Sequence, residues 1–439
     1  MNKPYVALVG RPNTGKSTLF NRLAGRRISI VDDTPGVTRD RVIAQAEWSS
    51  NAFYVIDTGG IEPYSDETIP AGMRRQAFLA MDMADVIIFV VDGREGLTAD
   101  DKEIAHLLQK NKNKVVLAVN KIENASQIND TYEFYELGLG EPFAISGEHG
   151  NGVGDLLDEV IGKFPEEMTG AELNEGKRIA IVGRPNSGKS TLVNALLKED
   201  RVIVSDIAGT TRDAIDVPFT YEGEEYTLVD TAGIRKNAKQ GDSIEYYSMI
   251  RALRAIERSD ICLLVIDATE KALDQDIRIA SAIKDANKAV VIVINKWDLV
   301  KKDTNTMAEM EKEIRGKLHV IDYAPMVFIS AIDSGRLHKL MPVVQDTLAQ
   351  YSRRIQTGLL NEAVASAFEM NQPPMKKGRS LKLYYTSQPS DSPPTFVFFL
   401  NDESLMTDTY AKYLEGRLRE AFGFSGTPLK FIFRSKKEK

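Results

Sequence analysis

The chain has 439 residues, of which 43% are hydrophobic, 27% charged and 8% aromatic, and its formal net charge is −7. This composition excludes collagenous, mucin-like and wholly disordered chains, and the length predicts about three domains at roughly 150 residues each. Neither a signal-peptide apolar region nor an apolar run of roughly 18 residues is present, so we expect a cytoplasmic protein with no membrane partner.

The first apolar run, YVALVG, leads into GRPNTGKS at residues 10–17. This octapeptide fits the P-loop pattern, and the residues after it have the apolar period of a helix. Its glycines let successive backbone N–H groups point at phosphate oxygens, and the helix adds its positive N-terminal end. The lysine places a cation against the β- and γ-phosphates, and the serine offers a hydroxyl to Mg²⁺. The residues assigned to nucleotide binding here are Gly10, Arg11, Pro12, Asn13, Thr14, Gly15, Lys16 and Ser17.

Three further motifs of the first half extend this nucleotide site. The aspartate of DTGG, which ends the run NAFYVIDT, can hold the magnesium shell, and Gly60 can bring an N–H group to the γ-phosphate. Thr38 is expected to close over Mg²⁺ when a γ-phosphate is present, the alternative being a solvent-facing loop threonine. NKIE follows the run KVVLAVN, and a serine ends the run PFAIS. The residues assigned are Thr38, Asp57, Thr58, Gly59, Gly60, Ile61, Asn120, Lys121, Ile122, Glu123 and Ser146.

The sequence then repeats itself. IAIVGRPNSGKSTL at 179–192 matches VALVGRPNTGKSTL at 6–19 in eleven of fourteen positions, and the TRD, DTxG and NK motifs recur in the same order. Two copies of one domain, 1–165 and 177–350, are therefore predicted in tandem, joined by an acidic linker at 166–176. Each is predicted to be a doubly wound α/β domain with a parallel sheet covered on both faces. The corresponding residues are Gly183, Arg184, Pro185, Asn186, Ser187, Gly188, Lys189, Ser190, Thr211, Asp230, Thr231, Ala232, Gly233, Ile234, Asn295, Lys296, Trp297, Asp298, Ser330 and Ala331.

The NKxD motif predicts which base is bound. Asp298 can accept hydrogen bonds from both N1–H and the 2-amino group of guanine, a donor pair that adenine lacks. The lysine stem can lie over the ring, and Ser330-Ala331 is suited to contact the base O6. In the first copy Glu123 keeps the charge but is one methylene longer, so guanine is predicted there with a looser or weaker fit.

The remaining reactive side chains indicate no second chemistry. Cys262, the single cysteine, sits in the run ICLLVID and is predicted to be a buried, inert thiol rather than a nucleophile. The four histidines are widely spaced, without metal-ligand spacing, and we interpret them as structural or surface residues.

Residues 351–439 follow a different pattern, α-β-β-α-β, typical of a small α+β domain. QPSDSPP is predicted to be a turn-rich loop between its first two strands. From Arg353 onward 14 lysines and arginines oppose nine aspartates and glutamates, a net charge of +5. This favours either a polyanionic partner or a solvated positive face. GFSG at 423–426 falls between the last helix and strand, so we interpret it as a helix stop and turn rather than an RNA-clamping GxxG loop, and RNA contact through other basic surfaces stays open.

The tandem P-loop domains and the basic tail resemble the Der (EngA) family, the bacterial double-Era GTPases. The resemblance covers nearly the whole chain and implies GTP/GDP and Mg²⁺ as ligands and a KH-like C-terminal domain. It also implies GTP hydrolysis in assembly of the large ribosomal subunit, with rRNA and ribosomal proteins as partners, by a protein we expect to be a monomer. The metal ligands it implies are Ser17, Thr38, Asp57, Ser190, Thr211 and Asp230.

The resemblance also offers a device for hydrolysis. Ile61 and Ile234 occupy the position where Ras-type enzymes carry a water-orienting glutamine, which they cannot replace. Asn13 and Asn186 match the asparagine that binds K⁺ in related GTPases, and the alternative is that they merely hold the loop turn. The residues expected to act in catalysis are Lys16, Lys189, Asn13, Asn186, Thr38 and Thr211.

Three classes of function compete at this point. The first is a GTP-driven assembly switch that binds ribosomal RNA and protein. The second is a metabolic phosphotransferase, which would need an acceptor pocket and a catalytic base beyond the P-loop. The third is a nucleotide-dependent scaffold in which one site binds without turnover. The complete NKxD of the second copy argues against an ATP-using kinase.

Overall fold

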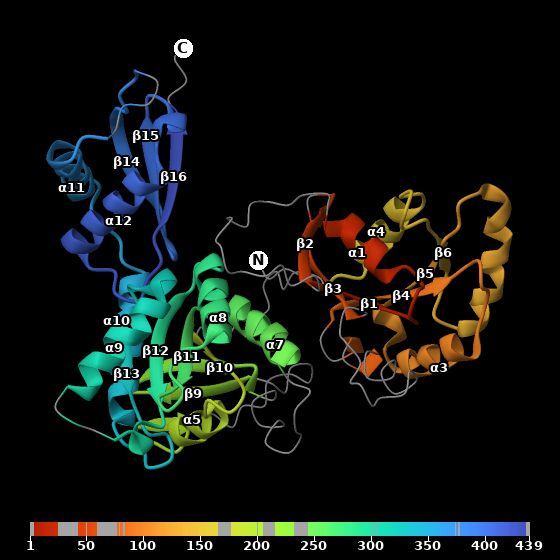
Figure 1. Cartoon of the computed structure of the whole chain (residues 1–439), viewed down its shortest axis with the longest axis horizontal. Helices are drawn as coiled ribbons and strands as arrows, with labels where there is room; N and C mark the ends of the chain where they lie inside the picture. Colours follow the sequence, from red (N-terminus) through yellow and green to blue (C-terminus); the bar gives the residue numbers. More distant parts are fainter. Residues whose placement is uncertain are drawn as a thin grey trace. The chain divides into compact units, whose positions relative to one another are not determined.

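Figure 1 shows the computed structural model of the chain, which forms two compact units, Met1–Ala171 and Glu172–Lys439. The boundaries predicted at residues 165, 176 and 350 stay predictions. No helix among the described residues is both long and apolar enough to cross a membrane. The structure describes residues 4–24, 43–49, 51–58, 77–78, 80–81, 84–165, 177–199, 201–204, 216–231, 245–301, 303, 305–373, 375 and 378–435.

The first unit is built on a six-stranded sheet in the order β2-β3-β1-β4-β5-β6. All neighbouring strands are parallel except β2 and β3, which are antiparallel. The strands β4 and β5 are buried along their whole length, as expected of a sheet covered on both faces. The elements are β1 (Tyr5–Val9), α1 (Lys16–Ala24), β2 (Ile43–Trp48), β3 (Asn51–Asp57), β4 (Val86–Asp92), α3 (Ala99–Leu108), β5 (Val115–Asn120), the 3-10 helix η3 (Ala125–Leu137), β6 (Pro142–Ala144) and α4 (Val153–Gly162).

The second unit begins with a seven-stranded sheet in the order β13-β12-β11-β7-β10-β9-β8. Its first five strands are parallel, and β9 and β8 are antiparallel additions at one edge. The elements are β7 (Lys177–Val182), α5 (Lys189–Leu196), β8 (Val202–Val204), β9 (Val217–Tyr221), β10 (Glu224–Val229), α7 (Glu245–Arg258), β11 (Ile261–Asp267), α8 (Asp274–Asp285), β12 (Ala289–Asn295), α9 (Thr306–Lys317), β13 (Met326–Phe328) and α10 (Leu340–Tyr351).

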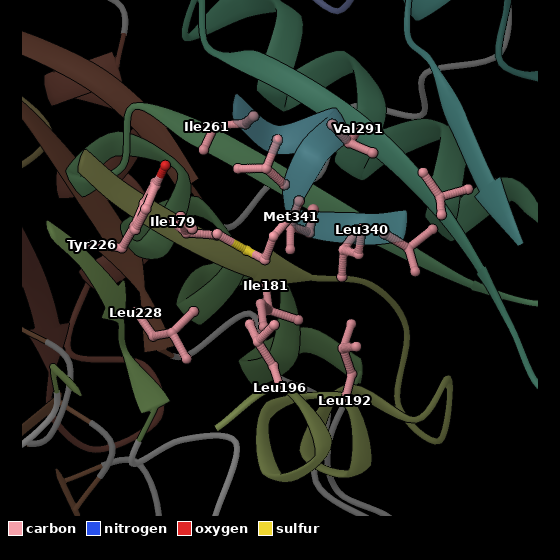
Figure 2. Close-up of a cluster of buried hydrophobic side chains, with 14 of the residues drawn as sticks. Ile179, Ile181, Leu192, Leu196, Tyr226, Leu228, Ile261, Val291, Leu340 and Met341 are labelled. Carbon is pink, nitrogen blue, oxygen red and sulfur yellow. The ribbon is translucent and has the colours of Figure 1, made fainter. Parts of the chain in front are cut away.

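Alternate residues of the second sheet supply two separate cores, one on each face. Figure 2 shows the core beneath α5 and α10, where Ile179 and Ile181 of β7 meet Leu192 and Met341. The opposite face packs against α7, α8 and α9 and contains Cys262. Cys262 is buried there, as predicted, and burial raises the pKa of its thiol to about 12. The doubly wound architecture is thus confirmed, and the antiparallel edge strands are additions to it.

The C-terminal part of the second unit has the predicted order α-β-β-α-β. Its three strands pair in the order β14-β15-β16, antiparallel and then parallel. The side chains of Phe396, Phe398 and Leu400 point from β15 into a core shared with both helices. The elements are α11 (Thr357–Met370), β14 (Leu383–Asp391), β15 (Pro394–Leu400), α12 (Asp408–Phe422) and β16 (Lys430–Ser435).

The prediction of a loop at QPSDSPP is wrong. Strand β14 continues to Asp391, and the turn to β15 takes only two residues. The side chain of Gln388 accepts a hydrogen bond from the Ile355 N–H and donates one to the Arg353 carbonyl, both at 2.8 Å, which fixes this part of the strand. Since β14 is an edge strand with a bulge between Ser387 and Ser390, it tolerates the missing N–H of Pro389.

The turn GFSG joins the C-terminal part to the second sheet. Gly423 and Gly426 have φ values of 88° and 68°, and Phe424 between them is fully buried. The Val290 N–H, at the start of β12, donates to the Gly426 carbonyl at 2.8 Å, and the Gly426 N–H donates to the Tyr323 carbonyl at 2.8 Å. A Cβ at Gly426 would lie 2.5 Å from Cγ2 of Thr347. The predicted helix stop and turn is confirmed, and its backbone is occupied by contacts within the unit.

Two equivalent helices of the repeat begin differently. The N-cap Thr98 of α3 accepts a hydrogen bond from the Asp101 N–H at 3.3 Å, and its own N–H donates to the buried Asp101 carboxylate at 3.2 Å. Leu273, the N-cap of α8, has no side-chain oxygen and is 43% exposed, and the Asp276 Oδ1 atom is buried without a partner among the described residues. The helix α8 therefore lacks a cap that α3 has.

We predict opposite effects of cap exchange in the two copies. Leu273→Thr should increase the free energy of opening of α8 by about 1 kcal/mol, and Thr98→Ala should decrease that of α3 by a similar amount. Native-state hydrogen exchange over residues 99–108 and 274–285 measures both values. In each variant the helix of the other unit is the control. Unchanged protection of α8 in Leu273→Thr would contradict the assignment of a missing cap.

Candidate nucleotide-binding sites

Both P-loops depend on a glycine that no other residue can replace. Gly15 and Gly188 precede α1 and α5 with φ values of 86° and 92°, in the left-handed region. A Cβ at Gly15 would lie 2.2 Å from Nδ2 of Asn120, and a Cβ at Gly188 would lie 2.2 Å from Nδ2 of Asn295. The glycines therefore allow the P-loop backbone to pass directly beside the first residue of each NKx(D/E) motif.

The asparagine side chains tie three loops together. In the first copy the Asn120 amide donates to the Thr14 carbonyl at 2.8 Å and accepts from the Gly147 N–H at 2.8 Å. In the second copy the Asn295 amide donates to the Ser187 carbonyl and accepts from the Ala331 N–H, both at 3.0 Å. Both asparagines are buried. This buried bridge fixes the phosphate loop relative to the segment that follows the last strand of each sheet.

The side chains of the P-loop lysines donate hydrogen bonds to carbonyls of their own loops. Lys16 Nζ donates to the Gly10 carbonyl at 2.8 Å and to the Arg11 carbonyl at 2.5 Å, and Lys189 Nζ donates to the Arg184 carbonyl. Burial lowers the pKa of both lysines to about 8, against the opposing attraction of Asp57 for Lys16 and of Asp276 for Lys189. A phosphate placed in either loop would add the negative charge that favours the protonated amine. The loops therefore fit a polyphosphate chemically.

Two of the three predicted magnesium ligands of the first copy, Ser17 and Asp57, lie together. Ser17 Oγ donates to Oδ2 of Asp57 at 2.7 Å, and the carboxylate is buried at the end of β3. Hydroxyl and carboxylate oxygens are the ligands that Mg²⁺ prefers, so these residues fit the ion. Thr58 beside them is turned inward, its hydroxyl donating to the Leu8 carbonyl at 2.5 Å.

The equivalent carboxylate of the second copy has different surroundings. Asp230 has a φ of 56°, and its N–H donates to Oδ1 of Asp216 at 3.0 Å. Burial raises the pKa of Asp230 to about 6, although Arg251, Arg258 and Arg254 oppose the shift. A metal ion beside this carboxylate would favour its ionised form. Ser190 is the second residue of α5, as Ser17 is of α1, and Thr231 is buried like Thr58.

The lysines of the base motifs have carboxylate partners that sequence reasoning missed. Lys121 pairs with Asp92 and Lys296 pairs with Asp267, each at 2.5 Å, and both lysines have positive φ values. Although burial alone would raise the pKa of both aspartates, the lysine hydrogen bonds and nearby backbone N–H groups lower it below its ordinary value. Asp92 and Asp267 end the repeated runs DVIIFVVD and DICLLVID. Their recurrence at the same position of both copies was the sequence signal that could have identified them as part of the sites.

The two carboxylates at the fourth motif position lie in different surroundings. Glu123 is partly buried and pairs with Arg94, whereas Asp298 is exposed and forms no ion pair with any residue the structure describes. Ile122 and Trp297 before them are buried, and the Trp297 ring packs edge-on against Phe328. Ser146, Ser330 and Ala331 are buried beside the asparagine bridges.

The P-loop arginines pair with buried aspartates outside their loops. Arg11 Nε donates to the buried Asp101 at 2.9 Å, and Arg184 Nε donates to the buried Asp276 at 2.8 Å. Sequence reasoning missed these aspartates, which lie outside the motifs. The guanidinium groups thus anchor each loop to the start of α3 or α8, and the loop backbone remains available to phosphate.

The other P-loop positions divide by exposure. Asn13 and Asn186 have φ values of 66° and 62° and are exposed, whereas Thr14 and Ser187 are buried. The Thr14 hydroxyl donates to the Arg11 carbonyl at 3.0 Å, and the Ser187 hydroxyl is buried without a partner among the described residues. Pro12 is exposed and Pro185 half-buried. The predicted residues Thr38, Gly59, Gly60, Ile61, Thr211, Ala232, Gly233 and Ile234 lie outside the described residues.

Family models match most of the chain. The model of a 50S ribosome-binding GTPase matches twice, at residues 5–121 and 178–296. The model of the C-terminal KH-domain-like region of EngA bacterial GTPase enzymes matches residues 354–434.

Curated relatives match over the full length. GTPase Der of Alkaliphilus oremlandii is 54% identical over 436 residues, which are 99% of each chain. GTPase Der of Geobacillus thermodenitrificans is 53% identical over 438 residues, which are 100% of each chain. Among solved structures, Era in complex with MgGDPNP and a 16S ribosomal RNA segment is 25% identical and covers 58% of this chain and 91% of its own, with a TM-score of 0.31.

Removal of one asparagine bridge should weaken nucleotide binding in that copy alone. Asn120→Ala leaves the Thr14 carbonyl and the Gly147 N–H without their buried partner, at about 1–3 kcal/mol for each group. We expect the first site to bind GDP at least about tenfold more weakly in the full chain. Equilibrium titration with labelled GDP measures this, with the second site as internal reference. Asn51→Ala, which removes an exposed amide of the same unit, is the control, and parental affinity in Asn120→Ala would contradict the role of the bridge.

Proposed function

This chain belongs to the family of the GTPase Der, and from that premise we propose that its GTP hydrolysis drives a switch in the assembly of the large ribosomal subunit. The observation that carries the proposal is the repeated asparagine bridge, which holds a phosphate loop and a base loop together in each copy. The protein would act as a monomer in the cytoplasm.

In the proposed sites the P-loop backbone and its lysine hold the β- and γ-phosphates. Lys16 and Lys189 would exchange loop carbonyls for phosphate oxygens, and the phosphate charge would keep them protonated. Ser17 and Asp57, with Ser190 and Asp230, would hold Mg²⁺, whose charge offsets that of the phosphate oxygens during transfer. Thr38 and Thr211 would complete the metal shell when a γ-phosphate is present.

Guanine selection is assigned to the carboxylates of the base motifs. Asp298, exposed and without an ion pair among the described residues, would accept from N1–H and the 2-amino group of the base. Glu123 would do the same in the first copy with a longer side chain. The bridges hold the segments at Ser146 and at Ser330-Ala331 close to the base loops, and these segments would contact O6.

For hydrolysis we propose that K⁺ assists at the P-loop asparagines. Asn13 and Asn186 are exposed, and no hydrogen bond to another described residue occupies either side chain. Their amide oxygens would hold the ion beside the phosphates, where its charge would do the work of an arginine. Their left-handed backbone conformation equally suits a purely structural turn, so activity must separate the two roles.

The potassium role predicts a salt effect that depends on these side chains. Phosphate release should be on the order of tenfold faster in KCl than in NaCl at equal ionic strength. The Asn13→Ala, Asn186→Ala double variant should lose this difference while still binding GDP. Equal rates of the parent protein in the two salts would rule out the cation and redirect the search to an arginine.

The ribosomal part of the proposal is supported by charge and by one face of the C-terminal sheet. A family model described as a 50S ribosome-binding GTPase matches both copies, and the chain from Arg353 onward carries +5. In this part Tyr385, Phe399 and Arg434 are neighbours across the three strands, on the face opposite the helices. Exposed aromatic rings beside cations suit single-stranded RNA, whose bases stack on rings.

Sedimentation with ribosomal subunits tests this proposal. The protein should pellet with the large subunit in a GTP analogue and less in GDP. Arg434→Glu should weaken this binding several-fold and reduce its salt dependence, because one phosphate contact is lost. Arg417→Glu is the matched control, since Arg417 lies on α12 and pairs with Glu420. Parental binding by Arg434→Glu would remove the sheet face from the proposal, and binding to neither subunit in any nucleotide would remove the ribosomal role.

A further inference from the structure

An arginine outside the nucleotide motifs holds the base-motif carboxylate of the first copy. Arg94 lies in the loop that follows β4, and its Nη2 atom donates to Oε1 of Glu123. The other carboxylate oxygen of Glu123 has no hydrogen-bond partner in the part of the chain that the structure describes. Arg94 therefore sets the direction of the carboxylate while leaving Oε2 available.

The backbone of Arg94 is itself fixed at the base loop. Its N–H donates to Oδ1 of Asp92 at 2.9 Å, and Oδ2 of the same carboxylate pairs with Lys121. Asp92 thus connects the lysine of the motif to the residue that holds the glutamate. Lys121, Asp92, Arg94 and Glu123 form one continuous polar chain.

Arg94 also offsets the negative charge of a second carboxylate near Glu123. A ligand atom of Glu148, one of His149 and one of Glu123 all lie within 4.8 Å of one another. The Nε2 atom of His149 is 3.9 Å from the Glu123 carboxylate, farther than a hydrogen bond. Without the Arg94 cation, the Glu148 carboxylate would repel that of Glu123.

The second copy has no such group. Thr269 occupies the position of Arg94 in the repeated run, and its N–H and hydroxyl donate to Oδ1 of Asp267 at 2.8 and 2.7 Å. It is too short to extend toward Asp298, which forms no ion pair with a described residue. The arginine thus occurs in the copy whose carboxylate carries the extra methylene.

We propose that Arg94 is a positioning residue for guanine recognition, which holds the longer Glu123 carboxylate against the base in the first site. The inference rests on the proposed function of Glu123 as guanine acceptor. Glutamate has one more rotatable bond than aspartate, so a free carboxylate would lose more conformational freedom on binding the base. The ion pair with Arg94 already restricts the Glu123 side chain in the free protein, so less conformational entropy is lost when guanine binds.

The test uses the full chain with Lys189→Ala, so that the first site dominates nucleotide binding. Calorimetry measures the Kd values of GDP and of IDP, which lacks the 2-amino group. Arg94→Thr, the residue of the second copy, should weaken GDP binding about three- to fivefold and lower the preference for GDP over IDP. Arg94→Lys should restore part of the preference. Lys102→Thr, which breaks another exposed ion pair of the same unit, should change neither value.

A second background separates the outcomes. In Glu123→Ala, Arg94→Thr should have no further effect on the preference for GDP over IDP. An unchanged preference in Arg94→Thr alone, or an equal loss with and without Glu123, would overturn the positioning role. If Glu123→Ala itself leaves the preference unchanged, the proposed guanine role of Glu123 fails, and this inference falls with it.

Discussion

The close approach of a P-loop glycine to a buried asparagine is the contact on which both nucleotide-binding domains depend. Each asparagine ends a buried parallel strand, β5 or β12, and its amide bridges the P-loop and the segment after the last strand. An amide supplies a donor and an acceptor in one plane, which a carboxylate or a hydroxyl cannot do in the same place. Because a Cβ at Gly15 or Gly188 would lie only 2.2 Å from the amide nitrogen, the buried asparagine requires a glycine at this position.

Much of the architecture could be predicted because the sequence contains two copies of one domain, which can be compared with each other. The parallel strands are long apolar runs that recur in order, so the repeat identified both the sheets and the phosphate loops. The antiparallel strands were missed for two reasons: β2 and β9 carry polar residues such as Glu47 and Thr220, and β8 has only three residues. The end of β14 was taken for a loop because its order depends on the distant partners of Gln388.

The polar partners within the sites were harder to predict than the motifs themselves. Asp92 and Asp267 act through pairs with motif lysines, and Asp101 and Asp276 through P-loop arginines. An aspartate at a strand end or in a first helical turn has ordinary structural explanations, so local sequence gives it no chemical meaning. Only the fold brings residues about 90 positions apart within hydrogen-bond distance. The copies consequently share their framework and differ in the charged groups at its edge.

The turn at Gly426 ties the C-terminal part to the start of β12, and Asn295, which forms the asparagine bridge of the second copy, ends the same strand. Four consecutive buried residues separate Val290 from Asn295, a length of about 17 Å at the usual rise of a strand. The two attachments therefore lie on one buried strand of the second sheet. A substitution that shifts β12 would disturb the Asn295 bridge and the hydrogen bonds of the Gly426 turn together.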